Sequence, residues 1–185
     1  MILFLAGASH TGKTLLSQRL MERFHIPYLS IDHLKKGLIR SGQTTLTPMD
    51  DDRLTDYLWP IVREMVKTAI ENGQSLIVEG CYIPFNWKRD FSPEYLQHIQ
   101  YRCLIMSKNY IESHFEQIRS CANAIEQRLD DSDLCAERLI LDNGENLRRC
   151  REFGCEYILI DSSYTLDINR IFCTLRHPGI RENAR

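Results

Sequence analysis

Eight consecutive residues near the start of the chain have the types and spacing of a phosphate-binding loop. They fit the pattern G-x-x-x-x-G-K-[ST] and are Gly7, Ala8, Ser9, His10, Thr11, Gly12, Lys13 and Thr14. In such a loop the glycines let successive backbone N–H groups point at phosphate oxygens, and the following helix adds the positive end of its dipole. Lys13 would reach the β- and γ-phosphates, and the Thr14 hydroxyl would hold Mg²⁺. The pattern therefore predicts that ATP and Mg²⁺ bind here.

The segments on either side of this loop are those that the pattern requires. The apolar run 1–6 predicts a strand before it. Leu16, Leu20 and Phe24, spaced four apart, predict a helix after it. The alternative is an ordinary strand–turn–helix in which Lys13 is a solvated surface residue. The strand–loop–helix context favours phosphate binding.

An acidic residue follows the second apolar run. Asp32 comes directly after it, and Lys35 lies one helical turn further along. Ligands bind at the carboxyl ends of strands in parallel sheets, so we expect Asp32 to orient or deprotonate a phosphoryl acceptor. Lys35 is expected to meet an anionic acceptor. The alternative is that Asp32 only caps the following helix, and the two roles are compatible.

A second acid ends the third apolar run. Glu79 there is predicted to hold Mg²⁺ through water, or to take the proton from an acceptor hydroxyl. Gly80 would let the substrate approach the backbone. The structural alternative is a Glu79 that is paired with an arginine, because a buried carboxylate needs a partner.

Arg119, Arg128 and Arg138 lie in the second half of the chain, in a helical stretch. Phosphoryl transfer spreads negative charge over equatorial oxygens, which arginine stabilises. For each of these residues taken alone, a surface salt bridge is the simpler expectation. We nevertheless expect at least one of the three, with Arg119 and Arg128 as catalytic candidates, to close over the phosphates.

The composition excludes several classes of protein. A formal net charge of −2 offers no field for nucleic acid or for a membrane surface, and no apolar run approaches the length of a membrane span. The 7 cysteines are scattered and contain no C-x-x-C pair. We therefore expect reduced thiols in a cytoplasmic protein without signal peptide, zinc site or disulfide framework. The sequence leaves open whether it is a monomer or a homodimer.

Short apolar runs alternate with helical patterns along the whole chain. The runs that predict strands are 2–6, 28–31, 75–78, 103–106 and 157–160. Continuous apolar strands separated by helices favour a parallel sheet that is covered on both faces. We predict one α/β domain over residues 1–185, with the three-layer P-loop NTPase fold and a five-stranded parallel sheet.

The predicted helices supply two excursions from this core. Residues 33–73 would grip the acceptor, and residues 109–140 would form a lid that excludes water. The helices are predicted over 47–72, from Ser92-Pro93, over 110–129, over 133–152 and over 167–175. Thr47 is expected to cap the first of these and Pro60 to kink or split it. An interruption is expected near Asn143-Gly144.

Other polar or aromatic residues are given plainer interpretations. Asp50, Asp51 and Asp52 are interpreted as structural acids of a first helical turn, and Arg148, Arg149 and Arg151 as a solvated helix face. For Trp59 and Trp87, core packing and an acceptor-site wall are equally plausible. Ser162, Ser163 and Tyr164 stand where a purine pocket is commonly built.

The residues resemble those of the P-loop small-molecule kinases, a group that includes adenylate kinase, shikimate kinase, zeta toxins and 2-phosphoglycerate kinase. The resemblance rests on Gly7–Thr14, on Asp32 with Lys35, and on the stretch Glu79-Gly80-Cys81-Tyr82-Ile83-Pro84. That stretch is similar to the E-G-x-[HY]-[LI]-x-P run of 2-phosphoglycerate-kinase-like sequences, which implies that Gly80 and Tyr82 contact the acceptor. The D-G-F-P-R run of adenylate kinases and the D-T-D and G-G-G signatures of shikimate kinases are missing.

The resemblance implies ATP- and Mg²⁺-dependent phosphoryl transfer to a small-molecule acceptor, which could be a nucleoside, a nucleotide or a phosphorylated metabolite such as 2-phosphoglycerate. Two other functions stay open. One is a P-loop hydrolase or switch that acts through a protein partner. The other is a zeta-toxin-like kinase of a nucleotide-sugar.

Overall fold

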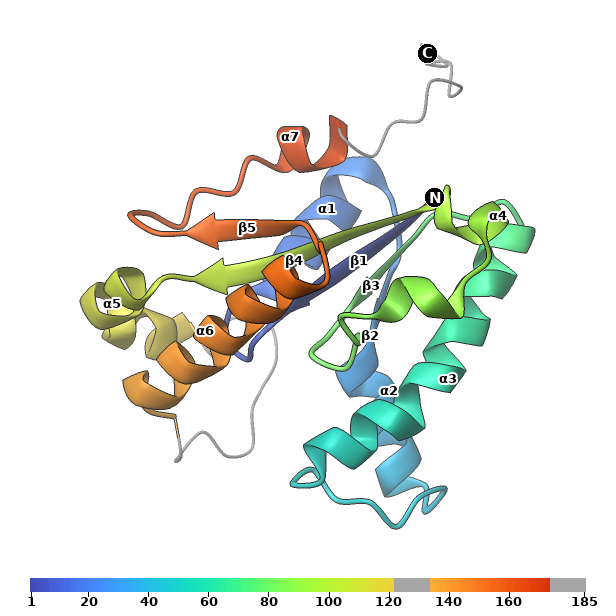
Figure 1. The fold of residues 1–185 in the computed structure, drawn as a ribbon, viewed down its shortest axis with the longest axis horizontal. Coiled ribbons are helices and arrows are strands. Elements are labelled where there is room, and N and C mark those ends of the chain that lie inside the picture. The colour runs from blue at the N-terminus through green and yellow to red at the C-terminus, as the bar shows by residue number, and fades with distance from the viewer. Residues whose placement is uncertain (122–133, 174–185) are drawn as a thin grey trace.

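The computed structural model describes residues 1–121 and 134–173 and contains a five-stranded, all-parallel sheet. The strands lie in the order β2-β3-β1-β4-β5 (Figure 1). Their bounds are β1 Ile2–Gly7, β2 Tyr28–Ser30, β3 Leu76–Glu79, β4 Ile99–Met106 and β5 Tyr157–Ile160. The predicted fold class is confirmed. Only β4 begins well before the predicted residue 103, because Gln100 and Arg102 interrupt the apolar pattern at its start.

Helices lie on both faces of the sheet (Figure 1). They are α1 Lys13–Phe24, α2 Ile31–Arg40, α3 Asp51–Glu71, α4 Pro93–Leu96, α5 Lys108–Ser120, α6 Ala136–Glu152 and α7 Ile168–Cys173, with the 3₁₀ helix η1 Trp87–Asp90. Alternate side chains of β1 enter two cores: Phe4 packs with residues of α3, whereas Leu3 and Leu5 pack with residues of α1 and α5. The sheet is therefore the middle of three layers, and each face buries its own apolar set.

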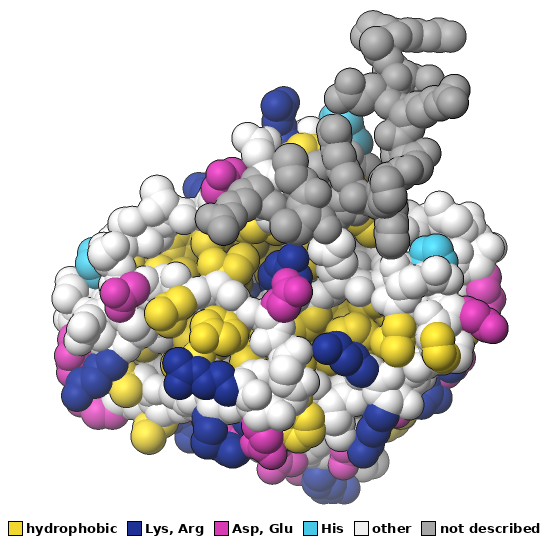
Figure 2. All heavy atoms as spheres, turned by 45° about the horizontal axis from the view of Figure 1, so that its top comes forward, with side chains coloured by type: hydrophobic (Ala, Val, Ile, Leu, Met, Phe, Trp, Pro, Cys, Tyr) yellow, Lys and Arg dark blue, Asp and Glu magenta, His cyan; other side chains and the backbone are white. Residues whose placement is uncertain are grey.

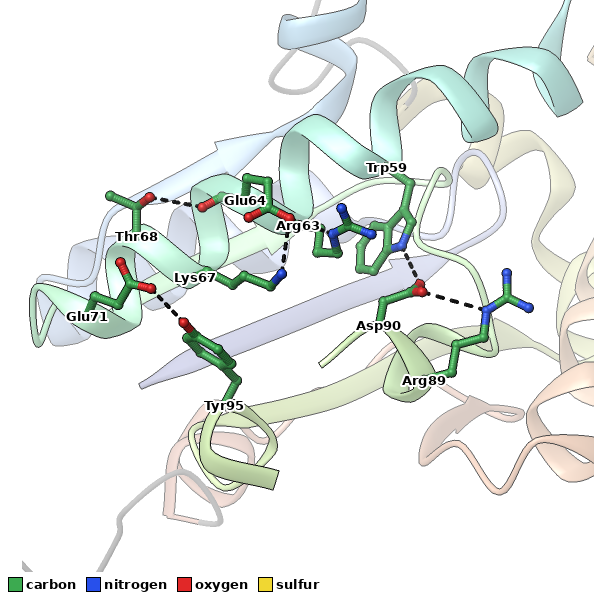
Figure 3. A network of polar contacts seen from close by, with 9 residues as sticks. All are labelled: Trp59, Arg63, Glu64, Lys67, Thr68, Glu71, Arg89, Asp90 and Tyr95. Atoms are coloured by element: carbon green, nitrogen blue, oxygen red, sulfur yellow. Dashed lines mark hydrogen bonds and ion pairs between the residues drawn. The ribbon is translucent and has the colours of Figure 1, made fainter. Parts of the chain in front are cut away.

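Both tryptophans belong to the core on the α3 side. The ring centroid of Phe4 lies 5.8 Å from that of Trp59 and 5.2 Å from that of Trp87. Trp59 Nε1 donates a hydrogen bond of 2.8 Å to Asp90 Oδ2, which joins α3 to η1 (Figure 3). Trp87 is thus a core residue. Trp59 is both a core residue and, as shown below, part of a cavity wall.

Helix α3 differs from the sequence prediction at its start. It begins at Asp51 rather than at residue 47, because Asp50 Oδ2 accepts hydrogen bonds of 2.8 Å from both the backbone N–H and the hydroxyl of Thr47. These bonds close a turn, so the prediction of Thr47 as the helix cap was wrong. Pro60 does not split the helix, which runs on as one element to Glu71.

Helix α6 also differs from the prediction, since it is continuous through Asn143. The side chain of Asn143 is buried, donates to the carbonyl of Leu139 and accepts from the backbone N–H of Met106, both over 2.8 Å. These two hydrogen bonds join α6 to the end of β4, and the helix continues through Asn143 without the predicted interruption. Helix α5 ends at Ser120, so the predicted continuation over 122–129 lies outside the described residues.

The surface agrees with the near-balanced charge of the sequence. On the face drawn in Figure 2, acidic and basic side chains are interspersed. None of the helices over 1–121 and 134–173 is long and apolar enough to cross a membrane. The six cysteines whose side chains are described are all free thiols.

Candidate active site

The phosphate-binding loop curls tightly at the carboxyl end of β1. Gly7 has a φ of +147°, and a Cβ added there would lie 2.7 Å from the carbonyl oxygen of Leu104. The side chains of Thr11 and Lys13 both donate to the carbonyl oxygen of Ala8, over 2.9 and 2.8 Å. The loop therefore closes on itself, which leaves its backbone N–H groups to form a concave anion-binding surface.

Lys13 is buried but keeps its charge. Only 6% of its surface is exposed. Burial lowers the pKa of Lys13, but the nearby Cys81, Glu79 and Asp32 together raise the pKa above its ordinary value. A lysine held this way is a fixed positive charge at the mouth of the loop.

The register of the sheet brings the two predicted acids to the loop. Ser30 at the end of β2 pairs with Glu79 at the end of β3, and Glu79 pairs with Leu5 of β1. Asp32, in the first turn of α2, and Glu79 therefore lie at the same edge as the phosphate-binding loop. This placement was predicted from the sequence, because parallel strands end on one edge.

Thr14 and Glu79 form the candidate metal site. The Thr14 hydroxyl donates to Glu79 Oε1 over 3.3 Å, and Glu79 is 1% exposed. A hydroxyl and a carboxylate are the hard oxygen donors that Mg²⁺ prefers, and Mg²⁺ usually completes its shell with water and phosphate oxygens. These two residues therefore fit Mg²⁺.

Asp32 and Lys35 form the acceptor side of the site. Asp32 Oδ1 lies 2.7 Å from Lys35 Nζ, and that Nζ also donates to the Tyr82 hydroxyl over 2.7 Å. Burial raises the pKa of Asp32, but the positive charges of Lys35, Lys13 and Lys36 outweigh it and leave the pKa below its ordinary value. Asp32 is therefore an ionised hydrogen-bond acceptor.

A cavity of about 870 Å³ opens in front of these groups. Its walls come from the loop, from Asp32 and Lys35, from the segment after β3, and from one face each of α3 and α6. The α3 wall is a stripe of residues on one face of the helix: Asp51, Asp52, Thr55, Asp56, Trp59, Pro60 and Arg63. The predicted excursion over 33–73 thus contributes a wall to the cavity.

The structure describes two of the three predicted lid arginines, and of these Arg138 alone is part of the cavity wall. Arg138 lines the cavity and pairs with Asp142 over 3.1 Å. Arg119 is exposed in the last turn of α5 and is not part of the cavity wall. Arg128 lies outside the described residues. The lid role of these arginines stays a prediction.

Several residues that line the cavity were missed in the sequence, among them Arg149 and Asp51. Arg149 lines the cavity, and its guanidinium carbon lies 4.8 Å from the ring centroid of Phe85, so its interpretation as part of a solvated face was wrong. Asp51 accepts a hydrogen bond of 2.9 Å from the Tyr82 hydroxyl, so it is more than an acid of a first helical turn. Helical spacing from Arg138 was the available signal for Arg149; none existed for the Asp51 contact.

Tyr164 lies against the phosphate-binding loop. Its hydroxyl donates to the carbonyl oxygen of Thr11 over 3.0 Å, and a Cβ at Gly12 would lie 1.9 Å from it. Burial raises the pKa of Tyr164 to about 12, so the hydroxyl keeps its proton. The contact places Tyr164 beside the loop, and its part in a purine pocket stays a prediction.

The same architecture occurs in solved structures of small kinases. The chain is similar to a shikimate kinase from Bacteroides thetaiotaomicron, with a TM-score of 0.56, 16% identity, and coverage of 95% of this chain and 98% of that one. It is also similar to a gluconokinase from Sinorhizobium meliloti, with a TM-score of 0.52, 15% identity, and coverage of 94% and 87%. No protein-family model matches the sequence, and no curated protein matches it significantly. The likeness to these structures shows the fold of the P-loop kinases over almost the whole chain.

Proposed function

We propose that the protein is a kinase that transfers the γ-phosphoryl group of ATP, with Mg²⁺, to a small-molecule acceptor. The observation that carries this proposal is the meeting of three groups at the carboxyl edge of the sheet: the buried Lys13, the Thr14–Glu79 pair and the ionised Asp32, which also lines the cavity. Phosphoryl transfer needs positioning and charge stabilisation more than covalent chemistry, and these groups supply both. The acceptor would be a nucleoside, a nucleotide or a phosphorylated metabolite such as 2-phosphoglycerate.

Each residue has a definite part in this proposal. Backbone N–H groups of residues 7–14 would bind the phosphates, and Lys13 would hold the β- and γ-phosphates. Thr14 directly, and Glu79 through water, would hold Mg²⁺, which neutralises developing charge on the phosphate oxygens. Asp32 would accept a hydrogen bond from the acceptor hydroxyl, turn it toward the phosphorus and receive its proton as the new bond forms.

The test is ADP release from ATP–Mg²⁺ across a panel of acceptors. The panel holds nucleosides, nucleoside monophosphates, phosphoglycerates, shikimate, gluconate and nucleotide-sugars. We expect one class to accelerate ADP release, and Lys13→Ala to abolish that acceleration without unfolding the protein. Lys108→Ala is the matched control, because Lys108 is exposed and pairs with Glu112 on the surface of α5.

The outcomes separate the functions that the sequence left open. An acceptor-dependent rate in folded Lys13→Ala would overturn the proposal. ADP release that is indifferent to every acceptor would favour the hydrolase or switch. Acceleration by nucleotide-sugars alone would identify the zeta-toxin-like kinase.

A further inference from the structure

A chain of polar contacts runs from the first turn of α3 to Asp32. The Tyr82 hydroxyl donates to Asp51 Oδ1 over 2.9 Å. Lys35 Nζ donates to the Tyr82 oxygen over 2.7 Å and lies 2.7 Å from Asp32 Oδ1. The chain therefore joins three elements: α3, the segment after β3, and α2.

The direction of these bonds is fixed by the number of protons available. A phenol has one proton, and Tyr82 gives it to the carboxylate of Asp51. The oxygen of Tyr82 then presents its lone pairs to Lys35, an ammonium that can only donate. Tyr82 is 5% exposed, and burial first and Asp51 second raise its pKa well above the ordinary value, so the proton stays in place.

The Lys35 ammonium consequently has two polar partners before any acceptor binds. It is shared between Asp32 and Tyr82, and the Lys35 side chain is 13% exposed. Such a cation is less suited to receive a further anion than to hold the carboxylate beside it. This differs from the role that the sequence predicts for Lys35.

We propose that Tyr82 and Asp51 are positioning residues that hold Lys35 against Asp32, so that Lys35 orients the carboxylate instead of binding an anionic acceptor. The catalytic meaning of this arrangement rests on the proposed kinase function. The arrangement itself is a property of the protein without substrate. It can therefore be tested separately.

Several titratable groups surround Asp32, and the test must separate the effect of Lys35 on the Asp32 pKa from the effects of the others. Lys35 and Lys36 face it from α2 and Lys13 from α1, while Cys81 and Tyr82 face it from the segment after β3. A change at Tyr82 leaves Lys13 and Lys36 in place. A double-mutant cycle then isolates the part of any change in the Asp32 pKa that depends on Lys35.

The other end of α3 supplies a matched control. There the Tyr95 hydroxyl donates to Glu71 Oε1 over 2.6 Å, the same kind of bond to the same helix (Figure 3). Neither residue lines the cavity. Tyr95→Phe therefore removes a tyrosine–carboxylate bond from α3 without touching Lys35.

The experiment follows the carboxyl carbon of Asp32 by NMR against pH, in the full chain labelled with ¹³C-aspartate and without nucleotide or acceptor. The Asp32→Asn variant assigns the signal. We expect Lys35→Gln to raise the Asp32 pKa most, and Tyr82→Phe and Asp51→Ala to raise it by about 0.5–1 unit. Asp51→Asn keeps a carbonyl acceptor for Tyr82 and should restore the wild-type value. Tyr95→Phe should leave Asp32 unchanged.

Three results would overturn the proposal. The first is an Asp32 pKa in Tyr82→Phe equal to that of the wild type. The second is a shift in Lys35→Gln/Tyr82→Phe as large as the sum of the single shifts, because Tyr82 would then act without Lys35. The third is an equal shift in Tyr95→Phe, which would indicate a helix-wide effect.

A kinetic readout applies once the acceptor panel has identified a substrate. Tyr82→Phe should lower kcat about tenfold, the effect of one lost hydrogen bond to a charged group, with little change in the acceptor KM. A rise in KM at unchanged kcat would instead assign Lys35 to acceptor binding and overturn the proposal. If no acceptor is found, the kinase function fails while the NMR result stands.

Discussion

The two ends of helix α3 are each held by a tyrosine that donates to a carboxylate, yet the two ends differ in what surrounds that bond. At the site end, Tyr82 is 5% exposed and its bond to Asp51 continues through Lys35 to Asp32. At the far end, the bond of Tyr95 to Glu71 lies on the surface, next to the Lys67–Glu64 pair (Figure 3).

The difference teaches that the surroundings of a hydrogen bond decide its effect more than its geometry does. Buried charges interact through a low effective dielectric, so displacing one partner is felt by the next. Exposed charges are screened by water and salt. Activity should therefore respond to changes at the site end of α3 and ignore equal changes at the far end.

The largest effect is expected at Asp32, where the partly buried chain of contacts ends. Asp32→Asn removes the carboxylate that turns the acceptor hydroxyl, and kcat should fall on the order of 10³-fold, within the range for a positioned base. Steady-state ADP release with the identified acceptor measures it. Asp161→Asn is the control, an exposed acid beyond the end of β5. A mutant that keeps more than a tenth of the wild-type kcat would remove Asp32 from the reaction.

Between the two ends, Pro60 interrupts the hydrogen bonding of α3 without splitting it. Pro60→Ala supplies the missing N–H, so the free energy of unfolding should rise by up to about 3 kcal/mol. Urea unfolding measures the change, and Met65→Ala, at an exposed position of the same helix, reports helix propensity alone. A less stable Pro60→Ala protein would mean that the proline ring packs more favourably than the interruption costs.

A smaller effect is expected from Tyr82→Phe, and it depends on pH. The pKa of Asp32 is lowered, so its charge and the activity are lost only as pH falls through that lowered value. The acid limb of kcat/KM should therefore lie below the ordinary carboxyl pKa in the wild type. It should move upward by about 0.5–1 unit in Tyr82→Phe, because Lys35 no longer stands as firmly beside the carboxylate. Identical pH profiles of the wild type and Tyr82→Phe would show that the tyrosine bond at the site end of α3 affects activity no more than the bond at the far end.

The smallest effects are expected at the far end. Tyr95→Phe and Glu64→Gln remove exposed contacts, and kcat, KM and Tm should all stay at the wild-type values within error. The variants are compared with the wild type at low and at high salt. A tenfold fall in kcat in either variant would show that the far end is coupled to the site.

The fold could be predicted because its signals are local and repeated. Each of the five strands contains an apolar run, and the long helices between them have their own periodicity. The errors fall where a side chain reaches across a boundary. Asp50 closes the turn before α3 by binding Thr47, and Asn143 keeps α6 continuous by binding Met106.

The residues of the site likewise divide into those that the sequence predicted and those that it did not. The phosphate-binding loop, Asp32 and Glu79 follow strand ends and were predicted from the chain order alone. Asp51 and Arg149 were not, because their partners Tyr82 and Phe85 lie 31 residues and 64 residues (149 − 85) away along the chain. A contact between such distant residues leaves no pattern in a single sequence.

The sequence by itself determined that this chain builds a parallel sheet with a phosphate-binding loop, because glycine conformation, apolar runs and strand order act locally or by general topology. Only the tertiary structure decided which side chains contact the Lys35 ammonium and which helices line the cavity. Those choices depend on how α3 and α6 pack over the sheet, and that packing is fixed by the shapes of residues far apart in the chain.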